Sequence, residues 1–128
     1  MRFWTIGCVL GLLAVAAGAF GAHALRATVP ADLLQAFETG ARYQMYHALA
    51  LLAVALGGHR LGGRGWRLAG WLFVAGVVLF SGSLYLLALT GVRWLGAITP
   101  LGGAAFLAGW IALTLAGRRG LRGETLSS

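Results

Sequence analysis

Four long stretches of the chain carry no charged side chain and consist mainly of apolar residues. They extend over Phe3–Leu25, Tyr43–Gly58, Leu68–Val92 and Trp94–Gly117. A helix needs about 20 mainly apolar residues to cross the hydrocarbon core of a bilayer, and the second stretch reaches this length only if preceding residues join its helix. We predict an all-α integral membrane protein, one domain over residues 1–128, with four transmembrane helices at about residues 3–25, 41–58, 68–91 and 96–117.

The segment between the first two stretches, RATVPADLLQAFETG, has a weaker helical pattern. Pro30 suits the first turn of a helix, and Asp32 lies near the positive end of that helix. Leu33, Leu34 and Phe37 recur at helical spacing. The pattern predicts either a short amphipathic helix on the outer membrane surface or an extension of the second span, and the sequence does not distinguish the two. If the helix bends, Gly40 is the expected position.

Composition supports the membrane class. Hydrophobic residues make up 59% of the chain and charged residues only 10%, against about 25% charged residues in soluble domains. The first stretch also resembles a secretory signal, with AHA at 22–24 as a cleavage site. Its apolar core is longer than that of a usual signal, so we interpret it as a retained helix.

The arginines set the orientation. The net charge is +7 and every basic residue other than histidine is an arginine. With four crossings, one side of the membrane holds Arg2, Arg60, Arg64, Arg67, Arg118, Arg119 and Arg122, and the other holds Arg26, Arg42 and Arg93. The positive-inside rule then places both termini in the cytoplasm, in a bacterial inner membrane. The arginines lie in short gaps rather than along one face, so we predict no nucleic-acid partner.

Small residues indicate close helix packing. The chain has 21 glycines, of which Gly7 and Gly11 form a GxxxG pair, and the last stretch carries alanines at every fourth position: Ala104, Ala108, Ala112 and Ala116. Small residues let helix backbones approach where lipid supplies no hydrophobic drive. These faces serve packing within the chain or, alternatively, a membrane-protein partner or a homo-oligomer. Trp66, Trp71 and Trp94 fit the interfacial positions that tryptophan prefers.

Polar side chains gather at one predicted depth, just inside the outer leaflet. The candidate ligand-binding residues are His23, Glu38, Arg42, Tyr43, Gln44, Tyr46, His47, Ser81, Ser83, Tyr85 and Thr99. Glu38 and Arg42 are four residues apart, so an ion pair is expected between them. One interpretation is a small polar pocket that opens outward. The other is a structural hydrogen-bond network that fixes the helix register.

Cofactor and enzyme functions have little support. His23 and His47 fall at similar predicted depth on neighbouring helices, so shared ligation of a haem or transition metal is a minor hypothesis. No nucleophile, base and acid set is recognisable, because Asp32 and Glu38 are predicted surface residues. We predict a protein that is not an enzyme, without catalytic residues, metal ligands or cofactors.

Four motifs carry a family resemblance. They are GAFGAHALR (18–26), FETGARYQMYHALALL (37–52), SGSLYLLALTG (81–91) and ITPLGG (98–103). In order and spacing they resemble the YgdD/YwdK-like family of small inner-membrane proteins of unknown function with four helices. The resemblance implies a membrane location and four spans, and it implies no catalytic residue.

The functional prediction is an accessory or interaction protein of the inner membrane, with the lipid bilayer as its surroundings. The alternative is binding or transport of a small ligand, lipid or ion through the outer polar cluster. Transport has less support because no internal repeat of the kind found in secondary transporters is present.

Overall fold

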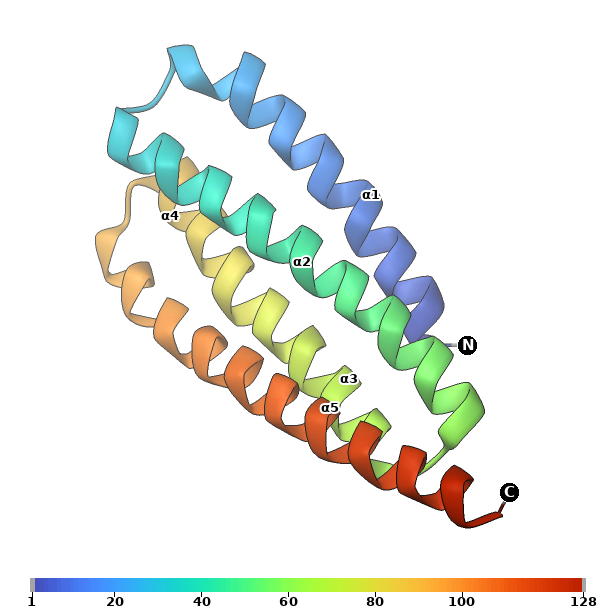
Figure 1. Cartoon of the computed structure of the whole chain (residues 1–128). Helices are drawn as coiled ribbons and strands as arrows, with labels where there is room; N and C mark the ends of the chain where they lie inside the picture. Colours follow the sequence, from blue (N-terminus) through green and yellow to red (C-terminus); the bar gives the residue numbers. More distant parts are fainter. Residues whose placement is uncertain (1, 128) are drawn as a thin grey trace.

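The computed structural model describes residues 2–127, and this part of the chain is helical with no strand (Figure 1). The elements in chain order are α1 (Arg2–His23), η1 (Leu25–Ala27), α2 (Ala31–Leu61), α3 (Arg64–Gly76), a π-helical turn η2 (Val77–Ser81), α4 (Gly82–Thr90), η3 (Arg93–Ala97) and α5 (Thr99–Ser127). α3, η2 and α4 follow one another without a break. We call the segment Arg64–Thr90 the α3–α4 rod.

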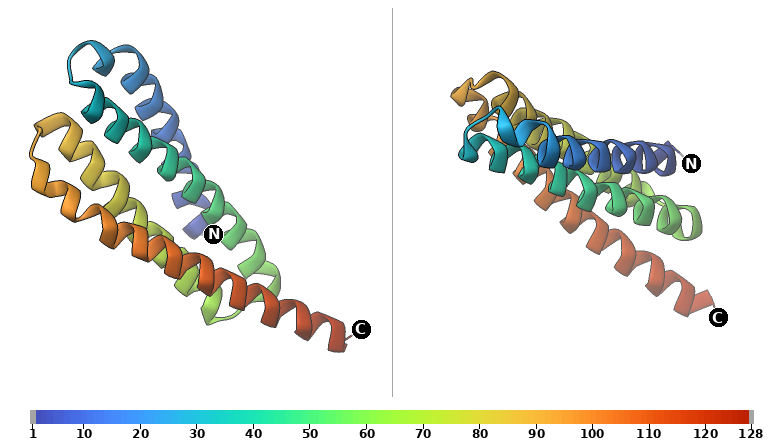
Figure 2. Two further views of the ribbon diagram at one scale, coloured as in Figure 1. Left: turned by 60° about the vertical axis from the view of Figure 1, so that its left-hand side comes forward. Right: turned by 90° about the horizontal axis from the view of Figure 1, so that it is seen from above.

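The helices lie side by side in the order α1, α2, α3–α4 rod, α5. α1 packs along α2, α2 packs on the rod, and the rod packs along α5. α1 begins and α5 ends at the same end of the bundle, as Figures 1 and 2 show. This end also carries the turn from α2 to α3, and we call it the arginine-rich end. Its arginines are Arg2, Arg60, Arg64, Arg67, Arg118, Arg119 and Arg122.

Three segments are long and apolar enough to cross a membrane. They are Arg2–Ala27, the α3–α4 rod and Arg93–Ser127. α2 is longer than a span requires but more polar, and it is the helix that the others cover. Its buried residues include Gln44 and His47, whereas α1 buries only Gly7, Ala14 and Gly21.

The segment before the second span is the predicted extension of that span, and the other prediction, a separate surface helix, is wrong. α2 is one helix from Ala31, and Pro30 caps it instead of lying in its first turn. The apolar side chains of Leu33 and Phe37 pack against Leu25 and Ala88, so they bury their surface in the bundle and not in the membrane surface. Gly40 lies inside this helix and does not interrupt it.

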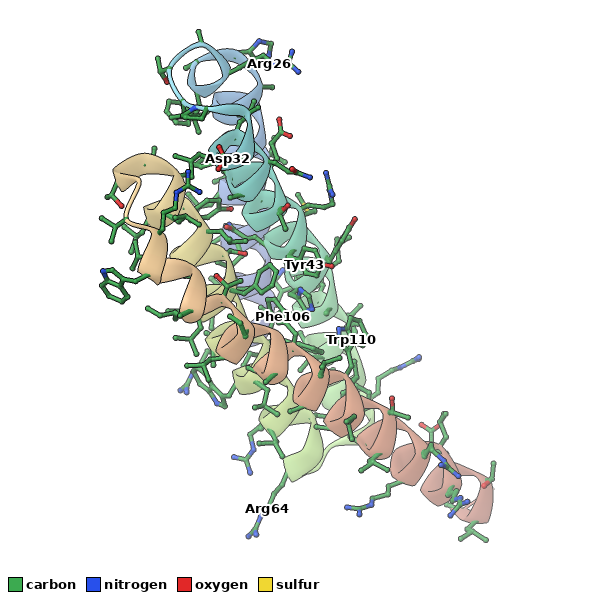
Figure 3. All side chains as sticks on the ribbon, turned by 90° about the vertical axis from the view of Figure 1, so that its left-hand side faces the viewer. Arg26, Asp32, Tyr43, Arg64, Phe106 and Trp110 are labelled. Atoms are coloured by element: carbon green, nitrogen blue, oxygen red, sulfur yellow. The ribbon has the colours of Figure 1, made fainter. Side chains whose placement is uncertain are left out.

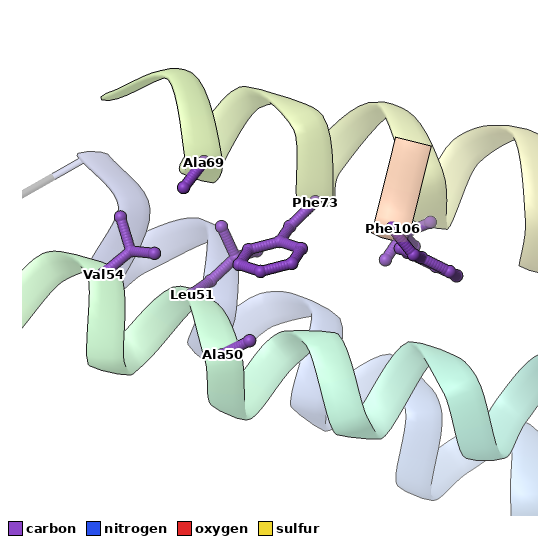
Figure 4. Packing of buried hydrophobic residues seen from close by; sticks show 7 residues of the cluster. Ala50, Leu51, Val54, Ala69, Phe73 and Phe106 are labelled. Carbon is purple, nitrogen blue, oxygen red and sulfur yellow. The ribbon is translucent and has the colours of Figure 1, made fainter. Parts of the chain in front are cut away.

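The larger core cluster consists of aliphatic and aromatic side chains from four elements, α2, α3, η2 and α5. Leu51 and Val54 of α2 meet Phe73 of α3 and Phe106 of α5, all buried (Figure 4). Ala50 and Ala69 complete the contact between α2 and α3. Burial of these side chains brings α2, α3 and α5 together at the centre of the molecule.

Small residues serve packing within the chain at several places where two helices approach closely. A Cβ atom on Gly7 would lie 3.0 Å from the Ala48 carbonyl oxygen. Gly65 makes the same kind of approach to Ala116, where an added Cβ would lie 2.9 Å from the alanine Cβ. The alanine face of α5 is divided, since Ala116 is buried whereas Ala104 and Ala108 are exposed.

Candidate functional site

A hydrogen-bonded network joins three helices through the side chain of Gln44. Its amide nitrogen donates to the Leu10 carbonyl oxygen of α1 at 2.8 Å, and its amide oxygen accepts from the Tyr85 hydroxyl of α4 at 2.7 Å. Gln44 is 4% exposed. Because a buried amide without partners costs free energy, these two bonds explain how α2 keeps a glutamine in its buried face.

Two serines of the rod extend this network. The Ser81 hydroxyl donates to the Gly40 carbonyl oxygen of α2 at 2.6 Å, and Ser81 is 1% exposed. Gly40 permits the contact, since a Cβ there would lie 3.0 Å from a ring carbon of Tyr85. Ser83 and Thr99 share a hydrogen bond of 2.6 Å between their hydroxyl oxygens, which links α4 to the start of α5. We call Gln44, Ser81, Ser83, Tyr85 and Thr99 the polar network.

His47 uses both ring nitrogens. The Trp110 indole N–H donates to Nε2 at 3.2 Å, so Nε2 carries no proton. Nδ1 then carries the proton and donates to the Tyr43 carbonyl oxygen at 2.7 Å. The ring also stacks on Phe106 with 3.5 Å between centroids. His47 is therefore a neutral side chain that fixes the contact between α2 and α5.

A groove runs beside His47 between α2 and α5 and has a volume of about 710 Å³. Tyr43 and Tyr46 form its α2 wall, and small and aromatic residues of α5 form the opposite wall (Figure 3). Its other lining residues are His47, Phe80, Pro100, Gly103, Ala104, Phe106, Leu107 and Trp110. We call it the α2–α5 groove. Sequence reasoning missed Phe106 and Trp110, although their spacing of four residues places them on one helix face.

The charged members of the predicted cluster lie outside both the polar network and the groove. Glu38 and Arg42 line a shallow hollow beside Gly18 of α1. Within residues 2–127 no ion pair joins them, so the predicted Glu38–Arg42 pair is absent. Arg42 is exposed and Glu38 is partly exposed. The predicted single pocket is therefore not one site.

The predicted similar depth of His23 and His47 is also wrong. The Gln44 bond sets Leu10 level with Gln44, and His23 lies thirteen residues farther along α1, roughly 20 Å along the axis at 1.5 Å per residue. His23 is exposed at the far end of α1. The distance between His23 and His47, and the hydrogen bonds on both ring nitrogens of His47, argue against shared ligation of a haem or metal. In the described chain no group of three or more His, Cys, Asp or Glu residues could hold a metal ion.

An ion pair fastens the start of α2 to the segment before α5. Arg93 donates to a carboxylate oxygen of Asp32 at 2.8 Å, and both side chains are more than half exposed. The hydrogen bond from Arg93 lowers the pKa of the Asp32 carboxyl below its ordinary value. The two residues are 61 positions apart in the chain, which is why sequence spacing did not reveal the pair.

These observations define the class: a helical membrane protein whose buried polar side chains bond its own helices together. The model of a family described as "Protein of unknown function (DUF423)" matches residues 17–103, and the chain belongs to this family. The matched part contains the whole polar network.

Bacterial relatives agree with this assignment. The UPF0382 membrane protein YwdK of Bacillus subtilis is 52% identical over 115 residues, which cover 89% of this chain and 94% of that relative. A UPF0382 membrane protein of Staphylococcus aureus is 45% identical over 115 residues, covering 89% and 93% of the two chains. The YwdK-like resemblance and the membrane class are thereby confirmed. No solved structure matches the chain.

Proposed function

We propose that the protein crosses the bacterial inner membrane four times, with both termini in the cytoplasm. At 1.5 Å per residue, a helix as long as α2 measures about 46 Å, more than the roughly 30 Å of a hydrocarbon core. Gln44 and His47 of α2 are turned to the other helices and do not meet lipid, whereas the exposed Arg42 is expected to extend toward the headgroups. The concentration of arginines at the end where α1 begins and α5 ends supports the cytoplasmic position of that end.

Within this topology the protein acts as an accessory membrane protein and not as an enzyme. One observation carries this proposal: the buried amide, imidazole and hydroxyl side chains of the described residues are already bonded inside the chain. Gln44, Ser81, Ser83 and His47 each have a partner on another helix or in the backbone. Groups held in this way stabilise the helix arrangement and present no unpaired nucleophile or base to a substrate.

The partner is a transmembrane helix of another membrane protein, bound laterally in the α2–α5 groove. Gly103 and Ala104 on the α5 wall allow close approach of a second backbone, as small residues do in membranes. Tyr46, Leu107 and Trp110 flank them with exposed rings and methyl groups. A partner helix would cover the exposed surface of these three side chains. Such a contact needs no charge, and no charged residue lines the groove.

Photo-crosslinking in native membranes tests this proposal. A photoreactive amino acid replaces Leu107 in the groove, and the matched control replaces Leu12 of α1; these leucines are 68% and 70% exposed. We expect one defined protein adduct from position 107 and none from position 12. Adducts of equal yield and pattern at both positions, or none at either, would contradict the proposal. If position 107 crosslinks only to a second copy of this chain, the groove binds a homo-oligomer partner and not another protein.

A second candidate function is binding of a small apolar ligand or lipid chain in the same groove. Its volume of about 710 Å³ lies within the range of about 300–1,000 Å³ of ligand pockets. Native mass spectrometry of the purified protein would show a retained molecule that His47→Ala releases. A protein without such a molecule, together with an adduct at position 107, would favour the partner helix.

A further inference from the structure

The arginine-rich end contains two hollows that share one wall. The first has a volume of about 430 Å³ and lies against α1, α2 and α3, and the second has about 380 Å³ and lies against α3 and α5. Arg64 and Trp66 line both hollows. Arg67 lines the first and Arg119 the second. Neither shares a residue with the α2–α5 groove.

Trp66 is the unusual member of this wall. It was predicted at the membrane interface, but its side chain is buried, with 9% exposed. Its indole nitrogen is buried and has no hydrogen-bond acceptor within residues 2–127. The ring lies across α2, where a Cβ on Gly57 would come within 2.2 Å of it. Gly57 therefore makes room for the ring, which is held with one donor unpaired.

The surrounding charge is positive. Arg64, Arg67, Arg119 and His59 line the two hollows, and no acidic residue does. Glu124, the acid at this end in the described chain, lines a separate hollow with Arg60. Arg64 extends from this end of the bundle, opposite the end that carries Arg26 and Asp32 (Figure 3). An anion entering here would meet arginines without a competing carboxylate.

The backbone contributes donors at the same place. α3 begins at Arg64 after Gly62 and Gly63, which have φ angles of 65° and 105°. Gly63 supplies no side-chain cap. The first N–H groups of a helix have no partner within the helix, and the helix dipole favours an anion there. Arginines, a buried indole donor and a helix start thus coincide.

We propose that this wall binds the phosphate of an anionic phospholipid headgroup, with an acyl chain lying along the apolar surface beneath it. Phosphate is the anion that guanidinium groups and helix N-termini bind best. The same hollows continue onto Phe3, Val54, Leu68 and Leu115, which suit an alkyl chain and have no role toward a free ion. A basic hollow between membrane helices near the cytoplasmic surface is a known form of headgroup site.

This proposal depends on the membrane location and is independent of the groove and its partner. The test uses the purified full-length chain in detergent, titrated with phosphatidylglycerol and read by native mass spectrometry. Phosphatidylcholine of the same acyl chains is the neutral comparison, and inorganic phosphate is the comparison without chains. We expect phosphatidylglycerol to bind at least tenfold more tightly than phosphatidylcholine, and inorganic phosphate not to displace it at equal concentration.

Two pairs of substitutions separate a built site from general attraction. Arg64→Gln with Arg67→Gln should weaken phosphatidylglycerol binding about 25-fold, since each arginine near a surface contributes about fivefold. Arg118→Gln with Arg122→Gln removes the same charge from the same end, but these residues line neither hollow. This control should keep binding within about twofold of the unmodified protein.

Conservative variants guard against misfolding. Trp66→Phe keeps the ring and removes the donor, and should weaken binding about fivefold, the value of one hydrogen bond. Arg64→Lys with Arg67→Lys keeps the charge and should retain most of the affinity. Equal losses in the two glutamine pairs, equal binding of both lipids, or displacement by inorganic phosphate would overturn the proposal. Crosslinking from position 107 should be unchanged in every variant, so the two proposals can fail separately.

Discussion

α1 and α2 lie against each other along most of their lengths, yet they bury opposite kinds of residue. α1 is the more apolar helix, and its buried positions are Gly7, Ala14 and Gly21, each seven residues from the next. Several of its large side chains, among them Leu12 and Val15, point outward. α2 is the more polar helix and buries Gln44 and His47 together with Leu51 and Val54.

The comparison shows how hydropathy and burial separate in a membrane protein. Lipid accepts large apolar side chains as readily as a protein core does, so they need not face the core. A polar side chain cannot remain in lipid unpaired, and a small residue is needed wherever two backbones approach closely. The helix with lower hydropathy therefore lies at the centre, and the helix with higher hydropathy faces outward.

The largest effect is expected from enlarging the small face of α1. Gly7→Leu would drive a side chain into the Ala48 carbonyl oxygen and Leu51, which the backbone of α2 holds in place. Overpacking costs about 1–3 kcal/mol, and we expect a loss of about 3 kcal/mol here because the neighbouring atoms belong to the α2 backbone and its Cβ positions. Unfolding by sodium dodecyl sulfate, followed by circular dichroism, measures the change.

Gly18→Leu is the matched control for this prediction. It adds the same side chain to the same helix, at a position where an added Cβ would meet nothing within 4 Å. Its effect should stay within about 0.5 kcal/mol, because the added side chain displaces no neighbouring atom. Equal losses for the two variants would mean that the small face of α1 has no special part in packing.

The next effect tests the polar side of the comparison. Gln44→Leu raises the hydropathy of α2 but leaves the Tyr85 hydroxyl without its acceptor. An unpaired buried group costs about 1–3 kcal/mol, so we expect a loss of about 2 kcal/mol in the same assay. Adding Tyr85→Phe should recover part of the loss.

Gln35→Leu controls for hydropathy alone, because Gln35 is an exposed glutamine on the same helix. It should change the free energy of unfolding by less than about 0.5 kcal/mol. If Gln44→Leu is more stable than the unmodified protein, the added apolar side chain contributes more free energy than the unpaired Tyr85 hydroxyl costs.

The pattern of the sequence predicted the three long apolar helical segments well, because apolar length is a direct requirement of the bilayer. It could not show whether residues 31–40 form a separate surface helix or extend the second span. Leu33 and Phe37 recur at helical spacing on a membrane surface and in a bundle alike, and only their packing on Leu25 and Ala88 distinguishes the two.

That same ambiguity produced the error in depth. Because α2 begins at Ala31, His47 lies sixteen residues into the helix and not near its start. The polar network was predictable in membership but not in pairing, since the Gln44–Tyr85 bond joins residues 41 positions apart. The α2–α5 groove was not predicted, because it depends on the angle between two helices that contact mainly through His47, Phe106 and Trp110.

A smaller effect is expected from Ser81→Ala. The substitution removes one hydroxyl that bonds the Gly40 carbonyl oxygen, which remains a member of the α2 helix. The expected loss is about 0.6–1 kcal/mol, the value of one interhelical hydrogen bond in a membrane protein. Ser127→Ala, at an exposed residue whose hydroxyl bonds only within α5, is the control and should have no measurable effect. If Ser81→Ala and Ser127→Ala lose similar amounts of unfolding free energy, Ser81 does not help to hold α2 against the rod.

The smallest effect concerns the exposed ion pair that joins α2 to η3. Arg93 lowers the pKa of the Asp32 carboxyl group. The folded chain therefore binds the proton of this carboxyl group more weakly than the unfolded chain does. The contribution of the pair is then complete above the ordinary pKa of 3.8 and is lost as the pH falls through the lowered value. Stability relative to Asp32→Asn should therefore be constant from pH 7 to pH 5 and should converge with it below pH 3.8. Because both side chains are more than half exposed, salt should reduce the difference at pH 7. A difference between the two proteins that is the same at pH 7 and at pH 3 would mean that the pair contributes nothing to holding α2 against η3.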